Sequence, residues 1–236
     1  MKKYKLILLT FLLALSTNAL FAHALWIETP AAGKVQQKQT VKIYYGEYAE
    51  NERDSVAKWY SDVKDLTLWL VGPDQKKIQL TLTPGLNHLE STFTPTENGI
   101  YILQVSHEAK ELGGDTKYHF LSSTNVTVGK VAQNTVKSTN VLQLKHDLTA
   151  KVNTKIKLAA SLNDTAAKDR TVSVFSPMGW TREIKTDENG YAEFTPLWPG
   201  TYVVEISDID KTPGQHYGKD FTSTWKGATY SFEVTK

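Results

Sequence analysis

The sequence contains no cysteine and only two methionines, Met1 and Met178. Without cysteine the chain has no disulfide framework, no thiolate metal site and no cysteine for lipid modification at a mature start. Soft sulfur ligands are nearly missing, so copper(I) and structural zinc fit the sequence poorly. A metal site in this protein would have to be built from nitrogen and oxygen donors.

The sequence also lacks a run of basic residues and the short motifs of common enzymes. It has no Gly-x-Ser-x-Gly elbow, phosphate-binding loop, dinucleotide glycine motif or His-Glu-x-x-His helix. Its formal net charge is +2, and removal of the three lysines in residues 1–22 leaves 24 basic residues against 25 acidic ones. Such a near-neutral chain gives no electrostatic reason to expect nucleic acid or a charged membrane surface as a partner. We therefore expect a protein that is not an enzyme.

Residues 1–22 have the pattern of a cleaved secretory signal. Lysines at positions 2, 3 and 5 precede an apolar run over 6–15 that is too short to span a bilayer. Small residues permit cleavage after Ala22 or after Ala24, and we prefer the cut after Ala22. The expected product is a periplasmic protein with no membrane anchor.

Most of the remaining chain has the periodicity of short strands. The first set covers residues 41–45, 66–71, 78–82, 100–105 and 124–128, separated by turn pairs such as Gly72-Pro73 and Asn98-Gly99. A second set covers residues 141–144, 155–160, 171–175, 191–194, 201–206 and 229–234. Only residues 50–63 allow a short helix, and an exposed loop fits their polarity equally well.

This pattern predicts an all-β protein with two tandem β-sandwich domains of the immunoglobulin-like or transthyretin-like kind. We expect the signal at 1–22, an N-terminal sandwich at 23–129, a polar linker at 130–139 and a C-terminal sandwich at 140–236. Residues 186–202 contain Asp-x-Asn-Gly and Pro-Gly turns that connect strands of the second sandwich. The other ligands of a calcium loop are missing there, so we interpret this segment as turns.

His23 is the strongest candidate for a metal ligand. Cleavage after Ala22 would make it the first residue, and it would then offer both an α-amino group and an imidazole to a borderline transition metal. Trp26 would anchor this end to the sandwich, and Glu28 would share a strand face with Trp26 because the two residues are two positions apart.

Three further histidines are candidate ligands. His107 and His119 flank a segment with several carboxylates, which we interpret as a loop at a sandwich edge. His216 lies within a long polar stretch, residues 208–220, that could lean on the first domain. His88 and His146 lie near turns among polar residues, and for them we expect surface roles.

Five segments carry a resemblance to a known family. They are residues 22–28 (Ala-His-Ala-Leu-Trp-Ile-Glu), 41–47 (Val-Lys-Ile-Tyr-Tyr-Gly-Glu), 70–74, 186–202 and 225–232. Their order resembles periplasmic proteins once known only as a domain of unknown function, some of them encoded beside nickel and cobalt uptake systems and called NikK. The resemblance implies a nickel or cobalt binding protein that presents its ion to a transporter. Members often have a histidine directly after the glycine of the second strand, where this chain has Glu47.

The leading hypothesis is a periplasmic protein that binds nickel or cobalt, with copper as an alternative ion, and delivers it to an uptake transporter in the inner membrane. The expected ligands are His23 with His107, His119 or His216, together with Glu28 or Glu47 as carboxylates. One alternative is an immunoglobulin-like envelope interaction module without metal. Another is a copper monooxygenase in which the terminal histidine and a second imidazole form a histidine brace.

Overall fold

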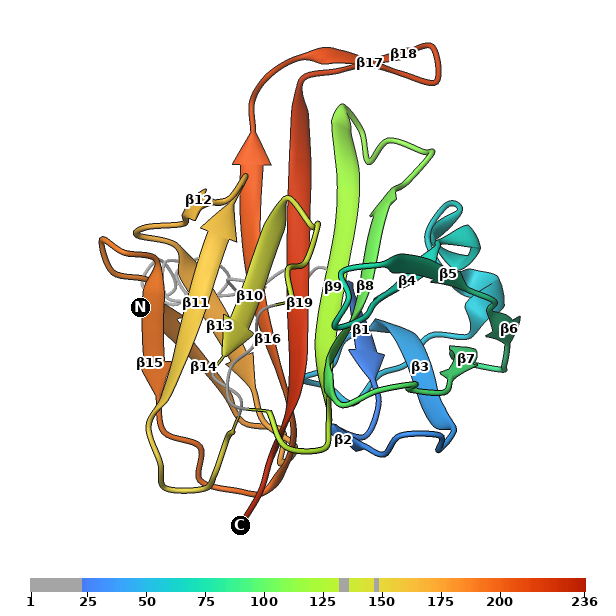
Figure 1. The fold of residues 1–236 in the computed structure, drawn as a ribbon. Helices are drawn as coiled ribbons and strands as arrows, with labels where there is room; N and C mark the ends of the chain where they lie inside the picture. The colour runs from blue at the N-terminus through green and yellow to red at the C-terminus, as the bar shows by residue number, and fades with distance from the viewer. Residues whose placement is uncertain (1–22, 132–135, 147–148) are drawn as a thin grey trace, which may run out of the picture.

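The computed structural model describes residues 23–131, 136–146 and 149–236. The predicted signal at 1–22 lies outside the described residues, as does part of the predicted linker. The regular secondary structure of the described chain is almost entirely β-strand, as the periodicity predicted (Figure 1). In place of a helix over 50–63 it has two short 3₁₀ turns, η1 (Val56–Lys58) and η2 (Val63–Asp65).

One nine-stranded sheet runs through both halves of the chain. Eight of its strands lie in the order β14 (Thr181–Lys185), β13 (Thr171–Phe175), β16 (Gly200–Asp210), β19 (Ser223–Val234), β9 (Thr116–Val128), β8 (Gly99–Glu108), β4 (Leu68–Val71) and β5 (Lys77–Leu80). The ninth, β2 (Ala32–Gly33), pairs with β9. The halves meet where β9 and β19 pair in parallel, from Thr116 beside Ser223 to Thr124 beside Ser231.

Two smaller sheets cover this large sheet. The first contains β1 (Ala24–Glu28), β3 (Gln39–Gly46), β7 (Leu89–Phe93) and β6 (Thr83–Pro84). The second contains β10 (Leu142–His146), β11 (Ile156–Leu162), β12 (Thr165–Ala166) and β15 (Tyr191–Phe194). The short strands β17 (Gly214–His216) and β18 (Lys219–Phe221) form a hairpin that projects beyond the sheets at the top of Figure 1.

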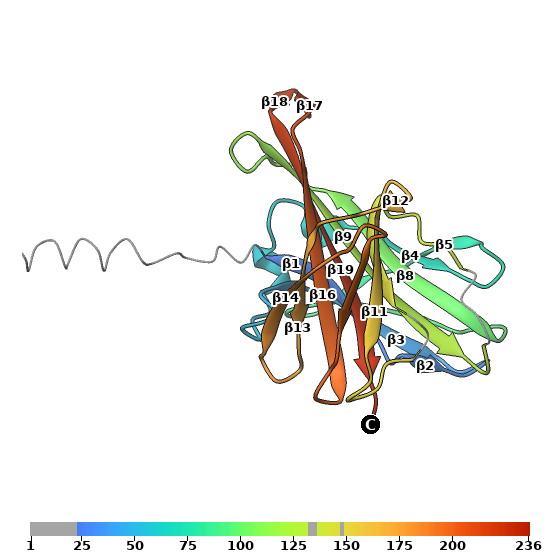
Figure 2. The same cartoon turned by 90° about the vertical axis from the view of Figure 1, so that its left-hand side faces the viewer.

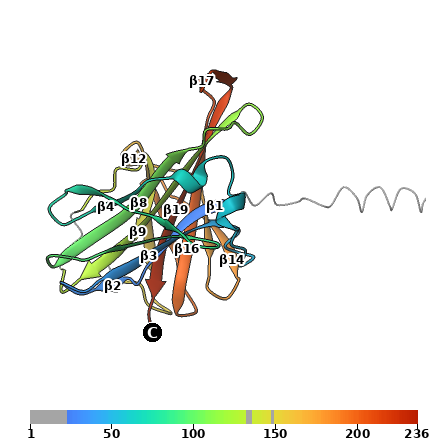
Figure 3. The same ribbon diagram turned by 90° about the vertical axis from the view of Figure 1, so that its right-hand side faces the viewer.

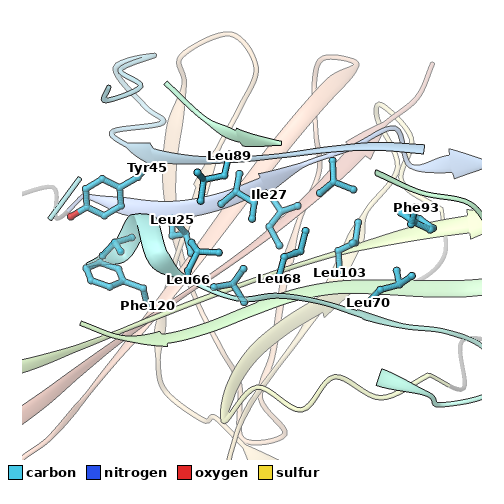
Figure 4. Close-up of a cluster of buried hydrophobic side chains, with 14 of the residues drawn as sticks. Leu25, Ile27, Tyr45, Leu66, Leu68, Leu70, Leu89, Phe93, Leu103 and Phe120 are labelled. Carbon is cyan, nitrogen blue, oxygen red and sulfur yellow. The ribbon is translucent and has the colours of Figure 1, made fainter. Parts of the chain in front are cut away.

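The small sheets pack on opposite faces of the large one (Figure 2). Side chains alternate between the faces of a strand, and on β9 Phe120 belongs to the core beneath β1 and β3, whereas Leu121 belongs to the core beneath β10 and β11. The first core includes Leu25 and Ile27 of β1, facing Leu68 and Leu103 of the large sheet (Figure 4). The arrangement is that of β-sandwich packing, as predicted, with one sheet shared by both halves.

The first strand is held firmly in place. Trp26 is fully buried and stacks on Tyr44, with 5.6 Å between ring centroids, and it packs in one cluster with Phe175 and Val203 from the large sheet. Burial of a large aromatic ring stabilises a fold by several kcal/mol, of the order lost when such a ring is truncated, roughly 3–5 kcal/mol. The beginning of β1 therefore has a defined position against β3 and the large sheet (Figure 3).

Candidate functional site

His23 directly precedes β1, and its imidazole lies between two carboxylates. Ala24 pairs with Gly46 of β3, so the chain just beyond that pair places His23 beside Glu47. His23 Nδ1 lies 3.4 Å from Glu47 Oε1, and His23 Nε2 lies 3.3 Å from Asp54 Oδ2. The imidazole remains 42% exposed, so solvent and small ions can reach it.

The loop after β3 brings Asp54 back towards His23. Gly46 has φ +149°, and a Cβ atom on it would lie 2.6 Å from the carbonyl oxygen of Glu52. Only glycine permits this close return of the backbone. The amide of Asp54 then donates to the carbonyl of Tyr45 at 2.9 Å. Sequence reasoning missed Asp54 because its approach to His23 depends on this loop closure and not on its spacing along a strand.

Glu47 is an unusually placed carboxylate. Its side chain is 14% exposed, and its Oε1 is buried and accepts no hydrogen bond, although the charge contact with His23 remains. Burial raises the pKa of Glu47; His23 opposes this rise, while the negative charges of Glu52, Glu50 and Asp54 add to it. A carboxylate in such surroundings gains from a nearby positive charge, and a bound cation would supply one.

Glu28 lies in different surroundings. The indole Nε1 of Trp26 donates to Glu28 Oε1 at 2.9 Å, which confirms that the two side chains share a face of β1. Arg53 Nη2 also lies 3.1 Å from Glu28 Oε1, and its guanidinium carbon lies 4.9 Å from the centroid of the Tyr44 ring. The described contacts thus pair Glu28 with Arg53 and Trp26, and none of them joins Glu28 to His23.

His107 and His119 lie in strands, so the expected loop between residues 107 and 119 is wrong at both ends. Strand β8 continues to Glu108, and β9 begins at Thr116. His107 pairs with Phe120, whereas His119 pairs with Glu108. Because paired residues share a face and neighbouring residues alternate, the two imidazoles lie on opposite faces of the sheet. With this register, His107 and His119 do not converge on a single ion.

Each of these imidazoles has its own partners. His107 Nε2 lies 3.2 Å from Asp62 Oδ1, which also accepts the amide hydrogen of Lys110. Burial works against ionisation of Asp62, but the hydrogen bonds from Lys110 and His107 hold its pKa below the usual value. His119 is buried, with its Nε2 2.8 Å from Ser106 Oγ.

Burial also lowers the pKa of His119 to about 4. The negative charge of Glu108 opposes this shift, and the positive charges of Lys117 and Lys226 assist it. His119 is therefore a neutral imidazole at neutral pH, surrounded by charged side chains on its face of the sheet.

The remaining histidines form local contacts. His216, in the projecting hairpin, donates from Nε2 to the carbonyl of Ala109 at 2.9 Å, so residues 208–220 do lean on the first half of the chain. His146 lies in β10, where its Nδ1 is 2.9 Å from the Tyr230 hydroxyl and its ring stacks on Phe232. His88 is 20% exposed and lies 3.7 Å from Glu90. Surface roles were expected for His88 and His146. In the structure both side chains are partly buried and contact neighbouring residues.

The described residues contain no preassembled group of three or more His, Asp or Glu side chains that could hold a metal ion. At His23 the reason is visible, since Glu47 and Asp54 contact opposite nitrogens of one ring. A metal ion would have to replace one of these contacts. The set of donors, an imidazole with two carboxylates, nevertheless suits nickel(II), cobalt(II) or copper(II).

The fold and this site define an all-β protein with a histidine–dicarboxylate cluster at the beginning of its first strand. The chain belongs to the family described as a domain of unknown function (DUF4198), which matches residues 20–210. The sequence predicted membership of a family known as a domain of unknown function, and this match confirms that membership. No curated protein matches the sequence.

The chain is similar to a small part of two crystal structures of Salmonella alpha-2-macroglobulin. One, of the protein reacted with methylamine, has 9% sequence identity and a TM-score of 0.31, and the match covers 90% of this chain and 15% of that one. The other, of a mutant, has 10% identity and a TM-score of 0.31, with 89% and 15% covered. The chain thus spans a small part of these larger proteins. In the part of the chain that the structure describes, no helix combines the length and apolar character needed to cross a bilayer.

Proposed function

We propose that this protein binds nickel(II) or cobalt(II) at the N-terminus of its mature chain in the periplasm and passes the ion to an uptake transporter in the inner membrane. The supporting observation is the position of the His23 imidazole between Glu47 and Asp54. Signal cleavage after Ala22 would add the α-amino group of His23 to these donors. The site would then combine one amine, one imidazole and carboxylate oxygens, which suits borderline metals.

This ligand set differs in part from the one expected from sequence. Glu47 takes the carboxylate role, Asp54 joins it, and Glu28 instead holds Arg53. A second imidazole is not required, and a histidine brace has less support because the described polar partners of the His23 ring are carboxylates. His107, His119 and His216 are each engaged in local contacts described above and are not part of the proposed site.

Delivery to a transporter requires that the ion be released. The partial exposure of the His23 imidazole leaves it open to a competing ligand on a partner protein. Free α-amino groups and imidazoles take up protons between about pH 8 and 6, and a protonated nitrogen cannot bind a metal. Affinity for nickel should therefore fall as the pH is lowered from about 7 towards 5.

The test uses protein processed in the periplasm, with its first residue verified by intact mass. We expect a chain beginning at His23 that gains one nickel ion in native mass spectrometry, and we expect His23→Ala to lose it while His88→Ala retains it. Calorimetry across the same pH range measures the predicted loss of affinity. A chain beginning at Leu25, a wild-type protein that binds no metal, or an affinity independent of pH would contradict the proposal.

A second candidate function is that of an envelope interaction module without metal. The projecting hairpin and the strand end that leads to it favour this function, because Tyr217 in the hairpin is 69% exposed and Ile209 near the end of β16 is 59% exposed. Exposed apolar side chains on a projection are typical of contact surfaces. Equilibrium dialysis against nickel, cobalt, copper and zinc separates the two functions, since a pure interaction module retains none of them stoichiometrically.

A further inference from the structure

A third carboxylate, from the other half of the chain, lies near the His23 site. Glu205 is on β16, where it pairs with Thr229 of β19, and Thr229 pairs with Ser122 of β9. Paired residues project from the same face of a sheet. Glu205, Thr229 and Ser122 therefore form a row of polar side chains across the centre of the large sheet.

This row lies beneath the start of β1. Thr229 Oγ1 donates to the carbonyl of Leu25 at 2.5 Å and lies 2.8 Å from Ser122 Oγ. Val203 precedes Glu205 by two positions and shares its face, and it packs in one cluster with Trp26. Two neighbours of Glu205 on this face, Thr229 and Val203, thus contact Leu25 and Trp26 of β1. Glu205 therefore faces the layer that carries His23 and Glu47.

The charge balance around Glu205 is unfavourable without a cation. Burial raises the pKa of Glu205 to about 7, and the negative charge of Glu47 adds to this rise. In the described part of the chain no lysine or arginine forms an ion pair with Glu205, although Arg53, Arg170 and Lys226 each pair with another carboxylate. Burial and the charge of Glu47 thus both disfavour the ionised form of Glu205, and a cation bound near the two carboxylates would offset this penalty.

We infer that Glu205 is a further ligand of the metal ion held at His23, supplied by the large sheet beneath β1. This inference rests on the proposed function. The ion would then join the two β-layers, because His23, Glu47 and Asp54 belong to the layer of β1 and β3, whereas Glu205 belongs to the large sheet. Metal binding should accordingly stabilise the contact between these layers as well as the terminus.

The test compares Glu205→Gln with Glu183→Gln, both in the mature chain beginning at His23. Glu183 is an exposed glutamate on β14 of the same sheet and serves as the matched control. We expect Glu205→Gln to weaken nickel binding, measured by calorimetry, about 10- to 100-fold, of the order seen when a group supporting a metal is removed. We also expect it to change the visible absorption spectrum of bound cobalt(II), and Glu183→Gln to change neither.

Thermal unfolding of the metal-free proteins distinguishes a ligand from a structural residue. If Glu205 is a ligand, replacing it with glutamine removes a buried charge beside Glu47, and the melting temperature of the metal-free protein should stay the same or rise. Nickel binding of wild-type strength in Glu205→Gln would overturn the inference while leaving the His23 site intact. A lower melting temperature with an unchanged cobalt spectrum would also overturn it. A wild-type protein that binds no nickel would instead contradict the proposed function itself.

Discussion

At position 119 the sheet holds an imidazole that is buried among charged side chains. Burial lowers its pKa in the folded protein to about 4, whereas a free imidazole has a pKa near 6.5. Between these two pH values the unfolded chain binds a proton that the folded protein does not bind. The free energy of unfolding therefore falls as the pH is lowered from about 6.5 to 4.

Replacement of His119 by Gln should remove this source of acid sensitivity. We expect the variant to gain stability relative to the wild type as the pH falls through that window, by roughly 2–3 kcal/mol at its lower end. Urea unfolding at pH 8, 6 and 4.5 measures the difference, with His88→Gln as the control. A stability difference that stays constant with pH would contradict the prediction.

At the scale of elements, one buried hydroxyl group adds a hydrogen bond to the apolar contacts between β1 and the large sheet. Thr229 Oγ1 bonds the carbonyl of Leu25 across the layers, while the backbone of Thr229 belongs to the pairing of β19. This hydrogen bond lies two residues from His23 in the chain and, with the β3 pairing and the packing of Trp26, holds the beginning of β1 in place. The site thus depends on a residue that is far from it in the sequence.

We expect Thr229→Val to lower the free energy of unfolding by about 1–3 kcal/mol, because it leaves the buried Leu25 carbonyl without its partner. Thr229→Ser keeps the hydroxyl and should retain most of the stability. Chemical denaturation measures both, and nickel calorimetry should show weaker binding for Thr229→Val. Equal stability of the two variants would indicate that the hydrogen bond contributes nothing.

The hairpin of β8 and β9 shows why strand ends were hard to predict. The apolar alternation over 100–105 stops where Ser106, His107 and Glu108 begin, so the sequence indicated a loop. Backbone pairing nevertheless continues through these residues to His119. Hydrogen bonds between strands do not require apolar side chains, and here the polar ones find partners such as Asp62 and Lys117.

At the scale of the whole molecule, the parallel pairing of β9 with β19 joins the two halves through one sheet. Each half buries one face of that sheet against its own small sheet. Separation of the halves would expose two long strand edges, with unpaired backbone groups, at the centre of the fold. The domain boundaries expected at residues 129 and 140 remain a prediction. The large sheet is not interrupted between the two halves, because β9 and β19 pair within it.

We therefore expect the mature protein to unfold in one cooperative transition. Scanning calorimetry should give a single peak whose van't Hoff enthalpy equals the calorimetric enthalpy. A fragment covering residues 23–129 should be unfolded or aggregated, because β9 would lose β19. Two separated peaks, or a stably folded fragment, would show that the halves are independent.

The sequence by itself determined the class of the fold and the residue to consider first. Strand periodicity depends on neighbouring residues, so alternation in segments such as 41–45 was enough to predict an all-β protein. His23 was recognised because the predicted cleavage after Ala22 would make it the first residue, and Trp26 because it follows three positions later on the same strand. Glu47 was recognised through the family resemblance, where a histidine often follows the glycine of the second strand. The absence of cysteine limited any metal site to nitrogen and oxygen donors.

Only the tertiary structure decided which side chains meet. The return of the loop after Gly46 places Asp54 at His23, and the register of β8 and β9 puts His107 and His119 on opposite faces. The packing of β1 on β19 puts Leu25 against Thr229, the partner of Glu205 in the large sheet. Each of these outcomes depends on contacts between segments far apart in the chain. Spacing within the sequence carries no information about such contacts, because they are set by how sheets pair and which faces they bury.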